Sequence, residues 1–194
     1  MNEVELIRAQ LLAERQHATE VANACAAALE SAGGQGVTSG SELDGFRQAC
    51  VDYLVWVLAQ FEERDQMLSD LFHARRNGGD VPTHDALNEI IARRGTSREA
   101  LTKLEAALVS NPTRATGDAP ADSWRAFAQF FNGAWSTRRN ALDELFERKA
   151  TVADWRVVSG IDADSILEER NRYQRVRAKL PAGIELHAPI VKGT

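Results

Sequence analysis

The sequence predicts an all-α protein, an antiparallel up-down-up-down four-helix bundle with one or two short C-terminal helices. Two observations lead to this fold class. Apolar residues recur at spacings of three and four along most of the 194 residues, which is the pattern of amphipathic helices. Breaks rich in Gly, Pro, Ser or Thr divide the chain into four long segments and a shorter C-terminal part. Long helices with short connections favour antiparallel neighbours. The sequence shows no repeat of fixed length, so a helical solenoid is the weaker alternative.

The first two helices have the clearest apolar faces. We expect the first over residues 2–31, with a seam formed by Val4, Ile7, Leu11, Ala18, Val21, Cys25 and Ala28. The Gly-, Ser- and Thr-rich segment 33–40 predicts a loop. Ser41 and Asp44 then have the spacing of a capping box, so the second helix is expected over about 41–76. Its apolar face comprises Leu43, Phe46, Cys50, Leu54, Val57, Phe61, Leu68 and Phe72.

The third and fourth helices are separated by a predicted surface loop at 113–120. The third is expected over about 82–111. A kink or restart is predicted at Gly95, because Thr96 follows with the capping-box spacing. The fourth begins near residue 122 and carries the aromatic residues Trp124, Phe127, Phe130, Phe131, Trp135 and Phe146.

Shorter helices are expected after the bundle. Asp154 lies at the capping-box spacing from Thr151, which predicts one short helix. A final helix capped by Asp162 or Asp164 is expected over 165–179. The prediction is one helical domain over 1–194, divided into a bundle over about 2–150, a helical extension over about 151–180 and an extended tail over 181–194.

Composition excludes several classes of function. The 23 Lys and Arg against 28 Asp and Glu give a net charge of −5, so no overall positive field attracts nucleic acid or an anionic membrane. We expect no leader segment, and no apolar run of the sequence approaches a membrane span of roughly 20 residues. We therefore expect a cytoplasmic protein. Cys25 and Cys50 fall at matching levels of adjacent helices and are interpreted first as small core residues, second as a redox pair.

Charged residues on the apolar seams are the main candidates for a site, because an unpaired charge in a core is costly. Counting along the folded-back helices at roughly 1.5 Å per residue places Asp65, Arg94 and Arg138 in one layer. One interpretation is a buried ion pair that fixes helix register. Another is an anion site in which Arg94 or Arg138 binds a ligand in forked geometry. A third is that the side chains reach solvent.

Glu14 and His17 are the candidate metal ligands. Three residues apart on one helix, they present an oxygen and a nitrogen to the same side, which is half of a di-iron carboxylate arrangement. The other such pair, Asp70 and His73, falls near the opposite end of the bundle by the same count. No metal site is therefore favoured, and His17 is expected to be a structural or surface histidine.

The final helix is basic. Part of this pattern is ordinary helix electrostatics, since bases favour the carboxyl end of a helix. A solvated face or a clamp onto the acidic bundle is the first interpretation, and a partner surface or a minor nucleic-acid contact is the second. The residues concerned are Arg170, Arg172, Arg175, Arg177 and Lys179.

Three stretches resemble the haemerythrin-like (HHE-type) four-helix bundles over about residues 5–155. They are Glu14-Arg15-Gln16-His17, Arg64-Asp65-Gln66-Met67-Leu68, and Arg138-Arg139-Asn140-Ala141-Leu142 followed by Asp154-Trp155. Metal-binding members of that family hold two irons with histidines and carboxylates, and here only His17 and Asp65 could correspond. The resemblance therefore implies a degenerate bundle that lacks most of the ligand histidines, in which Asp65 with two arginines replaces the metal as the polar core.

The function expected from these features is non-enzymatic binding of a partner protein or a small ligand. The aromatic candidates for a pocket, otherwise ordinary core residues, are Tyr53, Trp56, Trp124, Phe127, Phe131 and Trp135. The alternative is a metal-dependent or oxygen-related protein with a His-poor di-iron or other divalent-metal site around Glu14, His17 and Glu105. Bound metal would support that alternative, and Glu14 paired to an arginine would count against it. A self-associating homodimer is the third hypothesis.

Overall fold

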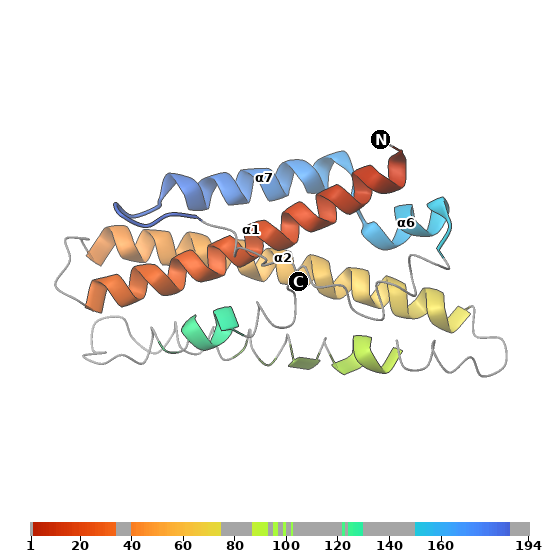
Figure 1. Cartoon of the computed structure of the whole chain (residues 1–194), viewed down its shortest axis with the longest axis horizontal. Coiled ribbons are helices and arrows are strands. Elements are labelled where there is room, and N and C mark those ends of the chain that lie inside the picture. Colours follow the sequence, from red (N-terminus) through yellow and green to blue (C-terminus); the bar gives the residue numbers. More distant parts are fainter. Residues whose placement is uncertain are drawn as a thin grey trace, which may run out of the picture.

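The computed structural model describes residues 2–33, 40–74, 87–92, 95–96, 99, 102, 122, 124–129 and 150–186. Every regular element in these residues is a helix, which confirms the all-α fold class. The complete helices are α1 (Glu3–Gly33), α2 (Gly40–Ala74), α6 (Val152–Ser159) and α7 (Ala163–Ala178), with helical pieces at 87–92 and 124–129 (Figure 1).

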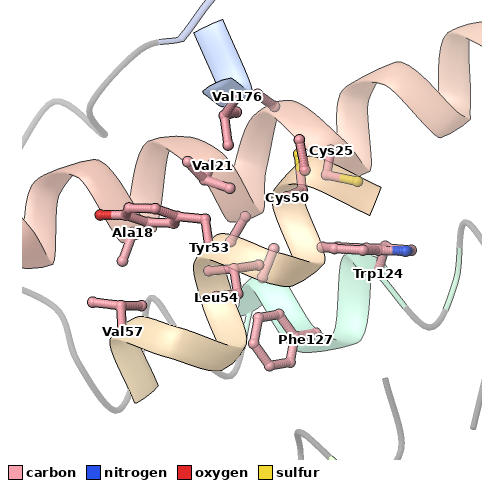
Figure 2. Close-up of a cluster of buried hydrophobic side chains, with 14 of the residues drawn as sticks. Ala18, Val21, Cys25, Cys50, Tyr53, Leu54, Val57, Trp124, Phe127 and Val176 are labelled. Carbon is pink, nitrogen blue, oxygen red and sulfur yellow. The ribbon is translucent and has the colours of Figure 1, made fainter. Parts of the chain in front are cut away.

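The helices α1 and α2 form an antiparallel pair. Near the start of α1, Ile7 packs with Leu68 and Phe72 from the last turns of α2. Near the other end, residues from the second half of α1 pack with the first half of α2, as Val21 and Tyr53 do in Figure 2. Burial of these apolar faces is what the spacing of three and four predicts.

The helix α7 lies along this pair, antiparallel to α2 (Figure 1). Its direction follows from two contacts. Glu169 in its first half meets Tyr53 of α2, whereas Lys179 just beyond its end lies beside Gly45, near the start of α2. Val176 is fully buried in the same apolar cluster as Tyr53. The C-terminal helix therefore completes the core formed by the second half of α1 and the first half of α2.

The capping predictions for the C-terminal helices are confirmed. At α6, Thr151 Oγ1 accepts from the Asp154 N–H at 3.3 Å, and Asp154 Oδ2 accepts from the Thr151 N–H at 2.6 Å. At α7 the cap is Asp162, whose Oδ1 accepts from the Ser165 N–H at 2.7 Å. The φ of +56° at Gly160 ends α6 in the left-handed region, which glycine adopts without the strain that a Cβ would introduce.

The two helical pieces join the same two apolar clusters. Leu87 and Ile90 pack with the last turns of α2, and Trp155 of α6 belongs to the same cluster. Trp124 and Phe127 pack on the opposite half of α2, as Figure 2 shows. Within the described part of the chain, none of the helices combines the length and apolar character needed to cross a bilayer.

Candidate functional site

Of the three charged residues predicted to share one layer, the structure describes only Asp65. This residue is buried, with 4% of its surface exposed, as expected for a polar residue on the seam of α2. Its predicted partners Arg94 and Arg138 lie outside the described residues. So do Trp135 and Glu105. The grouping of these residues stays a prediction.

Glu14 forms a buried ion pair with Arg64, which is also buried. Arg64 Nη1 donates to Glu14 Oε2 at 2.5 Å, and Arg64 Nε donates to the carbonyl oxygen of Ser159 at 2.6 Å. Gln10 Nε2 donates to the second carboxylate oxygen of Glu14 at 3.4 Å. The guanidinium thus neutralises a carboxylate with no exposed surface and also ties the end of α6 to α2, so the pair joins three helices.

Glu169 anchors α7 to both long helices. Its side chain is 4% exposed, and Oε1 accepts from the Tyr53 hydroxyl of α2 and lies 2.9 Å from His17 Nδ1 of α1. With a carboxylate as acceptor, His17 Nδ1 takes the donor role. The His17 ring stacks on Tyr173 with centroids 3.9 Å apart and planes 13° apart. Tyr173 in turn donates to Glu20, so α7 makes a second polar contact with α1.

These contacts separate the two candidate metal ligands. Glu14 is bound by Arg64, whereas His17 is bound through Nδ1 to Glu169. Over the described ranges, no group of three or more His, Cys, Asp or Glu side chains is placed to hold a metal ion. The described donor set therefore does not fit a two-iron centre, which needs several carboxylates and histidines around one position.

Tyr53 and Tyr173 are the two tyrosines of the sequence, and both lie in this network. Burial, followed by the neighbouring charge of Glu169, raises the pKa of the Tyr53 hydroxyl well above its ordinary value. Burial, followed by the hydrogen bond to Glu20, raises the pKa of Tyr173. In both cases the folded state favours the neutral phenol, because a phenolate would be desolvated beside a carboxylate.

This environment predicts a distinctive alkaline titration. A folded-state pKa above the unfolded value of about 10 means that the stability contribution is full below pH ~10 and is lost as pH rises through the folded-state pKa values. We expect ultraviolet titration of the native protein to show no tyrosinate absorbance near pH ~10, and ionisation to coincide with alkaline unfolding followed by circular dichroism. In denaturant both tyrosines should titrate normally. A native titration with a midpoint near pH ~10 would contradict the network.

A pocket lies between α2 and α7. Its lining combines α2 side chains with three cationic side chains spaced three and four residues apart along the end of α7, and hence on one helix face. The lining residues are Gln48, Ala49, Asp52, Tyr53, Arg172, Arg175 and Lys179. Tyr53 is shared with the Glu169 network, which places the pocket directly beside the anchor of α7.

The charge in this pocket is unbalanced. Arg172 Nε donates to Glu168 at 2.6 Å, and its guanidinium lies 5.7 Å from the centroid of the half-buried Trp56 ring. Arg175 and Lys179 form no ion pair with any carboxylate that the structure describes. Asp52 is the single acidic residue in the lining, and its Oδ1 accepts from Gln48 Nε2 at 2.8 Å. Three cations therefore line the pocket with one carboxylate.

Sequence reasoning missed the two residues that complete the buried network. Arg64 precedes the seam residue Asp65, and both are buried because α2 is covered on more than one side. Glu169 drew no prediction, because acidic residues are common in the first half of a helix. One signal could have found it: Glu169, Tyr173 and Val176 recur at spacings of four and three, as on the buried face of a helix.

Comparisons with protein-family models, with curated proteins and with solved structures find no match for this chain. The function therefore has to be inferred from the side chains themselves.

Proposed function

We propose that this protein is a non-enzymatic binding protein whose α2–α7 pocket receives an anionic group. The observation that carries the proposal is the convergence of Arg172, Arg175 and Lys179 on a pocket that contains one carboxylate, Asp52. Helix electrostatics explain why bases favour the last turns of α7. They do not explain why three of these bases line one pocket together with side chains of α2.

The chemistry of the lining favours a small carboxylate or phosphate. The Arg175 guanidinium can donate in forked geometry to such oxygens, and the Lys179 ammonium adds a mobile point charge. Arg172 adds positive charge while its Nε donates to Glu168 and its Nη1 to the carbonyl oxygen of Asp52. The Tyr53 ring and Ala49 supply apolar wall beside these donors. An anion here would offset the repulsion among the three cations, so binding is expected to stabilise the docked position of α7.

Support for a non-enzymatic role comes from the buried titratable groups. Glu14 is bound by Arg64, and Glu169 is bound by Tyr53 and His17. Each of these contacts links different helices, as structural ion pairs do. A metal ion at Glu14 and His17 would have to displace two of these contacts. We therefore interpret the haemerythrin-like resemblance as one of architecture, with Arg64 in place of a metal at Glu14.

We extend the proposal to an antiparallel four-helix bundle. Two contacts support it. Leu87 shares a cluster with Phe72 at the end of α2, whereas Trp124 shares a cluster with Phe46 at its start. A third helix that begins beside the end of α2 and a fourth that begins beside its start would run in alternating directions.

Calorimetric titration with inorganic phosphate at constant ionic strength tests the binding site. The wild-type chain is expected to bind phosphate, and the double variant Arg175→Gln/Lys179→Gln to bind it at least roughly tenfold more weakly, because two nearby charges are removed. The matched control is Arg170→Gln, an exposed residue of the same helix that does not line the pocket. It should retain wild-type affinity.

Two outcomes would count against the site. If the wild-type chain does not bind phosphate, the pocket is not a phosphate site. An equal loss in the Arg170→Gln control would mean that phosphate responds to the general charge of α7 rather than to the pocket.

A further inference from the structure

Cys25 of α1 and Cys50 of α2 lie side by side in the core. Both side chains have no exposed surface, and both thiols are free. Figure 2 shows the two side chains at the same level of the facing helices. Cys25 is also close enough to help raise the pKa of the Cys50 thiol, after burial. The two sulfur atoms are therefore neighbours across the α1–α2 interface.

Small residues make this close approach possible. Ala22 and Ala28 lie three residues before and after Cys25, on the same face of α1, and both are buried. Helices that meet through alanine can bring their backbones closer than helices that meet through leucine or phenylalanine. A disulfide needs such an approach, because its two Cα atoms must usually lie about 4.4–6.8 Å apart.

We propose that Cys25 and Cys50 form a reversible dithiol–disulfide pair that covalently ties α1 to α2. They are the two cysteines of the sequence, so no other disulfide can form within one chain. This modification site is independent of the anion pocket.

A hydroperoxide is the oxidant that closes the pair. One cysteine sulfur attacks the peroxide, the O–O bond breaks, and a sulfenic acid forms as the alkoxide leaves with a proton. The second sulfur attacks the sulfenic sulfur, forms the S–S bond and expels water, which takes the proton of the second thiol. The two thiols lose two electrons in total, and the hydroperoxide is reduced to an alcohol and water.

Burial slows the oxidation of Cys25 and Cys50 by peroxide. Burial, followed by the neighbouring Cys25 thiol, raises the pKa of the Cys50 thiol, and the neutral thiol is a poor nucleophile. Oxidation therefore waits for local opening at the end of α1. The pair should remain reduced during a brief exposure to peroxide and close during a sustained one.

The test is oxidation of the folded, full-length chain with hydrogen peroxide. After prolonged exposure, the intact monomer should lose the mass of two hydrogen atoms, and both cysteines should resist alkylation in denaturant until a reductant is added. The disulfide would close a loop that includes the α1–α2 connection. Loop-closure entropy then predicts a rise in Tm of roughly 5–10 °C for the oxidised form.

Cys25→Ala and Cys50→Ala, each with one thiol left, are the matched controls. Peroxide should not raise the Tm of either variant. Both variants keep Met67, so a change in Tm caused by oxidation of this methionine would also appear in them. The proposal is overturned if the wild-type thiols stay free, if they oxidise to sulfinic or sulfonic acid without an intramolecular disulfide, or if the disulfide form melts at a lower temperature than the reduced form.

Discussion

Replacing Arg64 by methionine is expected to lower the free energy of unfolding by about 3–5 kcal/mol, the usual cost of breaking a buried ion pair. Glu14 has no exposed surface and receives a short hydrogen bond from Arg64. Without the guanidinium, its carboxylate would stay buried without the cation that compensates it. The carbonyl oxygen of Ser159 would also lose its donor. Chemical denaturation followed by circular dichroism measures the loss.

The double variant Glu14→Leu/Arg64→Met separates the charge from the loss of packing. Replacing both members of a buried pair by apolar residues is often neutral or stabilising, because the desolvation cost of both charges disappears. The double variant should therefore regain most of the stability that Arg64→Met loses. If the two variants are equally unstable, or if Arg64→Met costs less than about 1 kcal/mol, Glu14 does not depend on Arg64 as described.

Replacing Glu169 by alanine is expected to cost about 2–4 kcal/mol and to loosen α7. The substitution removes the acceptor for the Tyr53 hydroxyl and the partner of His17 Nδ1. Tyr53 is fully buried, so its hydroxyl would lose its partner away from water. Chemical denaturation gives the stability loss. The substitution should speed amide hydrogen exchange more in α7 than in the first half of α2.

Glu168→Ala is the matched control for Glu169, because it removes a neighbouring carboxylate of the same helix. Glu168 is 39% exposed and pairs with Arg172 within α7, so its loss should cost about 0–1 kcal/mol. Equal costs for the two variants would mean that the buried contacts of Glu169 do not anchor α7.

Local patterns predicted the helices well because local physics determines them. The apolar spacing of residues 2–31 predicted the first helix within two residues of its end at Gly33. The Thr151 cap was predicted from one short motif, because a capping box involves residues only three apart. The choice between Asp162 and Asp164 needed the structure, since both have the residue type of a cap.

Partners between helices were harder to predict. Counting residues gives the depth along a bundle but not the rotation of each helix about its axis, and the rotation decides which side chains meet. Glu14 was correctly identified as a polar seam residue, but its partner Arg64 is not on the predicted apolar seam of α2. Glu169 belongs to a C-terminal helix whose side of contact no local pattern specifies. The matching levels of Cys25 and Cys50 were predicted, because a level depends on depth alone.

A two-dimensional amide NMR titration of the full-length protein with inorganic phosphate, at constant ionic strength, tests the proposed binding function most directly. We expect saturable shifts concentrated at the two pocket walls, residues 48–53 of α2 and 172–179 at the end of α7. Shifts spread over exposed cations throughout the molecule, or no saturable shift at these two walls, would contradict it.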